Sequence, residues 1–169
     1  GYSQIMVAQL EAGDVHEDEA AQSLAASLTH PSMKPSEAST GRCNLHAAHV
    51  GLLLANRERI DAVNRVSESI TIATLPERSL VQPEVMVATV KVIPFAVPKS
   101  DLSRCAEILE GDPVLRVAPL RKFDAGLVLT ELPGVSQALL ERASRTQRAR
   151  LNALGSRVRR EIRCEHSTD

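Results

Sequence analysis

Two neighbouring segments near the middle of the chain alternate between the two faces of an extended backbone, and they constrain the fold most. Residues 70–74 (Ile-Thr-Ile-Ala-Thr) and 85–93 (Val-Met-Val-Ala-Thr-Val-Lys-Val-Ile) are rich in β-branched side chains and have the two-residue period of strands. Prolines interrupt the connection between them, and proline has no amide donor for a sheet. We predict two paired strands. The second should be buried on both faces, except at Lys91.

Few side chains in this sequence are aromatic. Tyr2, Phe95 and Phe123 are the only ones, so the core must consist of Leu, Val, Ile and Ala. The shortage of stacking surfaces disfavours nucleic acid as a partner. The apolar run at residues 50–55 is far shorter than the roughly 20 residues that span a bilayer, so we expect no membrane segment.

The start of the chain and the cysteines bear on the compartment. The chain opens without Met, a basic segment or a long apolar segment, so we expect no signal peptide in it. Cys43, Cys105 and Cys164 are odd in number and widely spaced, which disfavours a disulfide framework and indicates the cytoplasm. All three are most simply core thiols.

Several polar residues are placed where helices should begin. Asp14 starts a capping box, Asn56 precedes a short helix over 57–64, and Ser100 or Asp101 precedes a later helix. Alternation over residues 5–10 predicts a further strand. Residues 31–42 are rich in Ser, Pro and Thr, and we expect a loop there.

Cys43, His46 and His49 have the residue types of a metal site, since thiols and imidazoles bind zinc. On a helix these positions diverge and rise at 1.5 Å per residue, so the three cannot converge on one ion. Two of them with Cys164 or His166 would suffice, but nothing in the sequence brings these together. We therefore predict no metal ion.

The last third of the chain has the pattern of a βαβ unit. An apolar run at 126–130 is followed by a loop at 131–134, a helix with one face at positions 140, 143, 147, 151 and 154, and a strand at 158–164. We predict an α/β protein, with an α+β region at 1–120 around a β-rich core and the first βαβ unit of an incomplete domain at 121–169. Such a unit is too small to stand alone.

Charge is unevenly distributed along the sequence. Residues 1–30 hold five acids and no Lys or Arg, whereas 142–163 hold eight arginines and one acid. We expect Arg142, Arg145 and Arg148 to form one basic stripe on a helix. The stripe is either a docking surface or an ordinary solvated face.

Several segments together resemble the MogA/MoeA-like molybdopterin-binding proteins, in particular a bacterial subgroup with an N-terminal region before a MogA-like α/β domain. The matching segments cover most of the chain in the same order: 8–21, 40–45, 59–64, 70–76, 86–97 and 127–134. The resemblance implies a three-layer α/β/α domain and a chain truncated at both ends. Two positions depart from the family: Glu84 replaces a glycine, and Leu140-Glu-Arg-Ala143 replaces an Asp-Lys-Thr sequence. A positive φ at Glu84 would cost about 1 kcal/mol.

The loop after the first strand of the βαβ unit is where we expect a ligand site. Ligands of open α/β sheets collect at the carboxyl ends of strands, so we predict a ligand site at Thr130, Glu131, Pro133, Gly134 and Ser136. The alternative is an ordinary strand-to-helix turn with Ser136 as the helix cap.

The resemblance implies binding of molybdopterin, or its nucleotide form, in molybdenum-cofactor biosynthesis or handling. The sequence holds no Ser-His-Asp constellation, P-loop or paired-carboxylate motif, so we name no catalytic residue and expect this fragment to bind rather than catalyse. The alternative is a non-catalytic interaction or oligomerisation module that docks through its arginines. Under either hypothesis we expect a homo-oligomer or a missing C-terminal domain.

Overall fold

The structure is a computed structural model that describes residues 10–166. The chain divides into two compact units, and each is described by itself: unit 1 extends to Pro119, and unit 2 begins at Leu120. Strands and helices are mixed, as predicted for an α/β protein. The strand predicted for residues 5–10 lies, apart from Leu10, outside the described residues.

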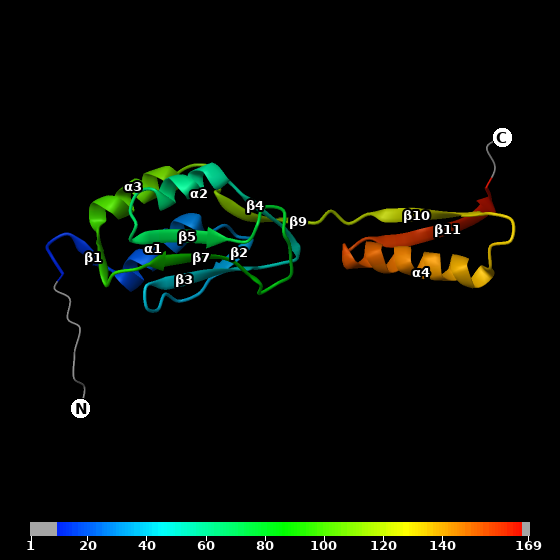
Figure 1. Cartoon of the computed structure of the whole chain (residues 1–169), viewed down its shortest axis with the longest axis horizontal. Coiled ribbons are helices and arrows are strands. Elements are labelled where there is room, and N and C mark those ends of the chain that lie inside the picture. The colour runs from blue at the N-terminus through cyan, green and yellow to red at the C-terminus, as the bar shows by residue number, and fades with distance from the viewer. Residues whose placement is uncertain (1–9, 167–169) are drawn as a thin grey trace, which may run out of the picture. The chain divides into compact units, whose positions relative to one another are not determined.

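A four-stranded antiparallel sheet forms the centre of unit 1 (Figure 1). Its order is β2 (Met33–Pro35), β3 (Arg42–Ala47), β7 (Met86–Val92) and β5 (Ile70–Thr74). Ile72 of β5 lies opposite Val90 of β7, which confirms the predicted strand pair. β2 lies inside the segment 31–42, so the prediction that all of it is loop is wrong. Met33–Pro35 pairs there with the end of β3.

This sheet buries one face only. Cys43, Ile72 and Val90 are buried on the face that α1 (Glu17–Leu28) covers, whereas Met86 and Lys91 of β7 are exposed. The predicted burial of the second strand on both faces is therefore wrong at Met86, whereas the exception predicted at Lys91 is correct. Lys91 is exposed because α1 packs on the opposite face of the sheet.

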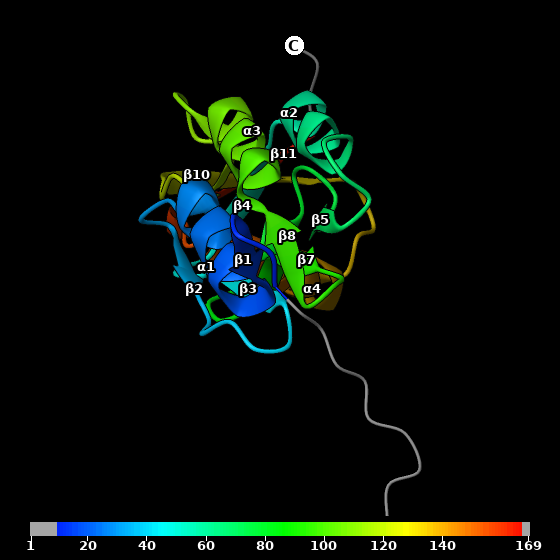
Figure 2. The ribbon, with the colours of Figure 1, turned by 90° about the vertical axis from the view of Figure 1, so that its left-hand side faces the viewer.

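The remaining elements of unit 1 complete its core. β6 (Leu80–Val81), β4 (Gly51–Ala55) and β9 (Leu115–Pro119) form a three-stranded sheet, and β1 (Asp14–His16) pairs with β8 (Ala96–Pro98). α2 (Arg57–Asn64) and α3 (Lys99–Leu109) contact each other (Figure 2). The Asn64 side chain joins α2 to β5, since it accepts from the Ile72 amide at 2.7 Å and donates to the Ile72 carbonyl at 3.0 Å.

The predicted helix caps are partly correct. Asn56 caps α2 as predicted, and its side-chain oxygen accepts from the Arg59 amide at 3.1 Å. Asp14 does not cap α1, which begins after His16, and no side chain caps α3, which begins after Pro98. Both predictions failed because the β1–β8 ladder, in which Asp14 lies opposite Pro98, shifts the helix starts.

Glu84 has a φ of +64°, the conformation that glycine adopts without strain. Its carboxylate lies 2.9 Å from the Lys34 ammonium, with both side chains exposed. Glu84 therefore has the positive φ for which a cost of about 1 kcal/mol is expected in a residue other than glycine.

Unit 2 is one βαβ unit, as predicted. β10 (Asp124–Glu131) and β11 (Arg157–Glu165) are parallel neighbours joined by α4 (Gln137–Ala153). Half-buried side chains of β10 alternate with exposed ones, because α4 covers one face of the pair. None of the helices formed by residues 10–166 combines the length and the apolar character needed to cross a bilayer.

The first prediction concerns the core of unit 1. Ile72 is 2 % exposed and Ile93, in the loop after β7, is 60 % exposed. We expect Ile72→Ala to lower the free energy of unfolding of unit 1 by about 2–5 kcal/mol, because it leaves a cavity. Ile93→Ala should change it by about 0.5 kcal/mol or less. Equal effects of the two substitutions in urea unfolding would contradict this assignment of the core.

Candidate functional site

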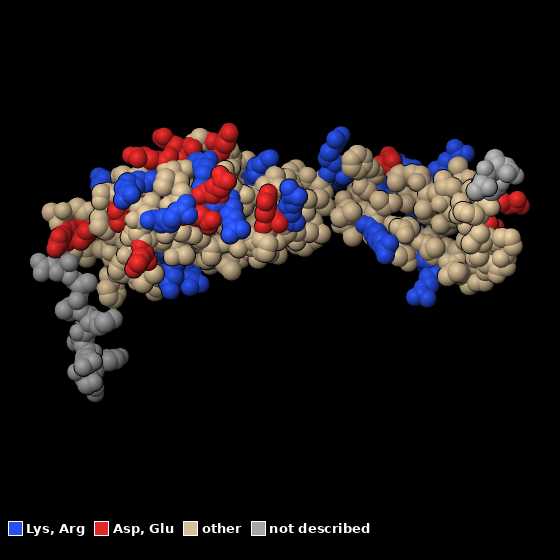
Figure 3. Space-filling view, turned by 45° about the horizontal axis from the view of Figure 1, so that its top comes forward, with Lys and Arg blue, Asp and Glu red and all other residues tan. Residues whose placement is uncertain are grey.

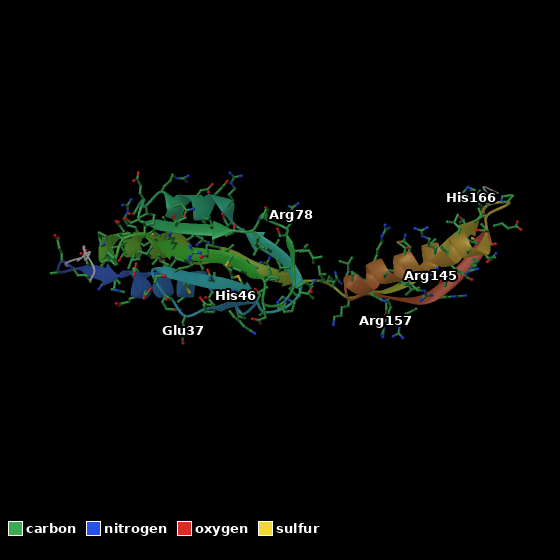
Figure 4. The ribbon with its side chains drawn as sticks, turned by 60° about the horizontal axis from the view of Figure 1, so that its bottom comes forward. Glu37, His46, Arg78, Arg145, Arg157 and His166 are labelled. Atoms are coloured by element: carbon green, nitrogen blue, oxygen red, sulfur yellow. The ribbon has the colours of Figure 1, made fainter. Side chains whose placement is uncertain are left out.

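Parallel pairing brings the carboxyl ends of β10 and β11 together at one edge of unit 2, which we call the carboxyl rim. Glu131 lies opposite Glu165, and the His166 amide donates to the Glu131 carbonyl at 3.0 Å. A groove of about 310 Å³ opens here, and it is lined by Glu131, Leu132, Pro133, Glu165 and His166. Figure 4 labels His166 at this end of the unit and Arg157 at the other.

The structure places the five predicted site residues differently. Glu131 and Pro133 line the groove, whereas Thr130 is an exposed strand residue opposite Cys164. Gly134 forms the turn with a φ of +85°. Ser136 caps α4, and its hydroxyl accepts from the Leu139 amide at 3.3 Å. Ser136 therefore has the role that an ordinary strand-to-helix turn gives it.

Three residues of the carboxyl rim were missing from the prediction. Glu165 and His166 line the groove, and Arg163 donates through Nη1 to the side-chain oxygen of Gln137 at 2.7 Å. Gln137 is the first residue of α4. The sequence could have indicated these residues, because the predicted parallel pairing places the end of the second strand beside the end of the first.

The carboxyl rim has two kinds of charge. Glu131 and Glu165 have no ion-pair partner within 4.0 Å among residues 10–166, so their oxygens are available to N–H donors. The guanidinium of Arg163 lies beside the start of α4, where the helix dipole and the backbone amides also favour an anion. The rim therefore suits a ligand with a donor edge and a negatively charged group.

Comparisons with known protein families, with curated proteins and with solved structures gave no match.

Cys43, His46 and His49 do not lie on a helix. Residues 42–47 form β3, whose alternation places buried Cys43 and half-buried His46 on opposite faces. The Cys43 thiol donates to the Ser36 carbonyl at 3.2 Å, and burial raises its pKa. Within residues 10–166, no three His, Cys, Asp or Glu side chains are placed to share a metal ion. Cys164 is exposed, so the prediction that all three cysteines are core thiols is wrong for it.

A polar network joins α4 to β11 beneath the helix. The Ser144 hydroxyl donates to Glu161 Oε2 at 2.5 Å, and Arg148 Nη2 donates to the same oxygen at 2.9 Å. Arg148 therefore faces the strands, and the predicted stripe of three outward arginines is wrong for this residue. The pKa of Glu161 is lowered, first by the Ser144 hydrogen bond and then by that of Arg148.

The second prediction follows from this pKa. Because the pKa of Glu161 is lower in the folded chain, its ionised form stabilises unit 2 above the unfolded-state pKa of about 4.3. That stabilisation is lost as pH falls through the folded pKa. We expect Glu161→Gln to destabilise unit 2 at pH 7 and the difference from wild type to shrink on acidification. Thermal unfolding of both proteins at several pH values measures this, and a difference independent of pH would contradict it.

Proposed function

We propose that the carboxyl rim of unit 2 binds molybdopterin or its nucleotide form, as the resemblance to MogA/MoeA-like proteins implies. The observation that carries the proposal is a groove lined by Glu131 and Glu165, neither of which has an ion-pair partner among residues 10–166. Arg163 supplies a cation at the start of α4 on the same rim, and its Nε also lies 3.7 Å from Glu161. A pterin with a phosphate has both complementary features. We also propose that unit 2 begins a MogA-like three-layer domain and that the chain works in the cytoplasm.

The carboxylates suit the ring of the ligand. The aminopyrimidinone edge of a pterin presents adjacent N–H donors, and a carboxylate accepts two such donors side by side. Glu131 and Glu165 line the same groove, which supports the proposal that one of them receives this edge. Leu132 and Pro133 add apolar surface beside them.

The start of α4 suits the phosphate. Backbone N–H groups at the start of a helix bind anions, and in α4 the Leu139 amide already donates to Ser136, which leaves the amides before it for the phosphate. Arg163 adds a positive charge beside Gln137, the first residue of that turn. The cation also offsets the repulsion between the phosphate and the two glutamates.

The third prediction tests this site. We expect Glu131→Gln and Arg163→Gln each to weaken molybdopterin binding by the full chain about tenfold or more, since each removes a charge-assisted hydrogen bond. Arg142→Gln is the matched control, because Arg142 is an exposed arginine of α4. Anaerobic fluorescence titration measures the three affinities. Absence of saturable binding, or an equal loss in the control, would refute the proposal.

A second candidate function is assembly with another copy of the chain. Val128 and Ile162 lie opposite each other on the face of the β10–β11 pair that α4 leaves uncovered, and they are 59 % and 41 % exposed. Two copies that share such a strip can cover it symmetrically. This proposal replaces docking through the arginines, because Arg145 lies 3.8 Å from Glu141 and Arg148 binds Glu161.

The fourth prediction concerns this assembly. Sedimentation of the wild-type chain should show a dimer, and Val128→Lys should shift it toward monomer, because the new charge would be buried between the copies. Leu139→Lys is the control, since Leu139 is a comparably exposed residue of α4. A wild-type monomer at all concentrations would rule out the assembly.

A further inference from the structure

The opposite edge of unit 2, which we call the amino rim, carries a second groove with different chemistry. It is formed where β10 and β11 begin and α4 ends, and it has a volume of about 430 Å³. Its lining consists of Lys122, Phe123, Asp124, Gly155 and Arg157. The volume is within the range of small-molecule sites, about 300–1,000 Å³.

Phe123 supplies an aromatic surface to this groove. Its side chain is 56 % exposed although it is one of only three aromatic residues in the sequence. The guanidinium carbon of Arg121 lies 5.4 Å from the ring centroid, within cation–π distance. An exposed ring among cations is a surface on which a nucleic-acid base stacks.

Asp124 holds two arginines beside the ring. Arg157 Nε lies 2.7 Å from one carboxylate oxygen, and Arg159 Nε lies 3.1 Å from the other. Each arginine uses Nε for this contact, and no hydrogen bond of its two terminal nitrogens is found among residues 10–166, so these remain as donors. These arginines lower the pKa of Asp124 by their hydrogen bonds. Asp124 thus acts as a positioning residue that fixes both guanidinium groups.

The local charge favours an anion. Arg121, Lys122, Arg157 and Arg159 outnumber the single acid Asp124. The end of α4 carries the negative end of the helix dipole, but the amides of Gly155 and Ser156 already donate to its carbonyls at Asn152 and Leu151, both at 2.9 Å. Basic side chains are also spread over the visible face of unit 2 in Figure 3.

We propose that the amino rim binds a nucleoside phosphate, with the base stacked on Phe123 and the phosphate held by Arg157, Arg159 and Lys122. The ligand is either a free nucleotide or one nucleotide of a single strand. The expectation that nucleic acid is disfavoured rested on the number of aromatic residues and not on their placement. This site is separate from the carboxyl rim and does not depend on molybdopterin binding.

The test uses the full chain at low salt with three probes: AMP, a labelled oligo-dT of about ten nucleotides, and inorganic phosphate. We expect saturable binding of AMP or the oligonucleotide, with inorganic phosphate a much weaker competitor because it lacks the base. Phe123→Leu should weaken binding about tenfold through lost stacking. Arg157→Gln should weaken it about as much through the lost phosphate contact, and Arg142→Gln should not.

The outcomes distinguish a free nucleotide from a single strand, and they show which results would overturn the proposal. AMP competing fully with the oligonucleotide assigns a free nucleotide, whereas tighter binding of the oligonucleotide assigns a single strand. Wild-type affinity in Phe123→Leu, equal losses in Arg157→Gln and Arg142→Gln, or no saturable binding would each overturn the proposal. Glu131→Gln should leave AMP binding unchanged, and this separates failure here from failure at the carboxyl rim.

Discussion

Unit 2 depends on the parallel pairing of β10 with β11. Parallel strands need a crossover, and α4 supplies it on one face only. The same pairing gathers both carboxyl ends at one rim and both amino ends at the other. Glu131 and Glu165 therefore meet at one groove, while Asp124 lies opposite Arg157 at the other. In an antiparallel pair, the end of one strand would lie beside the start of the other, so Glu131 and Glu165 would lie at opposite rims.

This arrangement leaves unit 2 with little apolar burial. Its buried residues within the described range are Leu140, Ser144 and Ser156, whereas unit 1 buries a continuous cluster that includes Leu45, Leu53 and Val90. The hydrogen bonds of Glu161 take the place of apolar packing between α4 and β11. A small unit of this kind gains stability from whatever covers its exposed sheet face, which agrees with the proposed assembly or with further elements of a larger domain.

Local sequence patterns predicted the helices and strands better than they predicted the contacts between residues far apart in the sequence. Alternation correctly gave the β5–β7 pair, and the order of strand, helix and strand correctly gave the βαβ unit. The cap at Asn56 was predictable because it depends on neighbours in the chain, whereas the β1–β8 ladder that displaced the cap at Asp14 joins residues far apart in sequence. The strand at Cys43 depends on a distant neighbour in the same way, because β3 is held by β7. At the carboxyl rim, Glu131 and Pro133 were predicted from the rule that ligands collect at the carboxyl ends of strands. Arg163 could not be predicted in this way, because its place in the rim is known only once the position of α4 is known.

We propose that the two rims of unit 2 bind different ligands, with molybdopterin at the carboxyl rim only. Hydrogen–deuterium exchange of the full chain, measured by mass spectrometry with and without molybdopterin, tests it most directly. We predict slower exchange at residues 131–139 and 163–166 and no change at residues 121–125 and 155–159. Protection confined to the second set of residues, or no protection in unit 2, would contradict the claim.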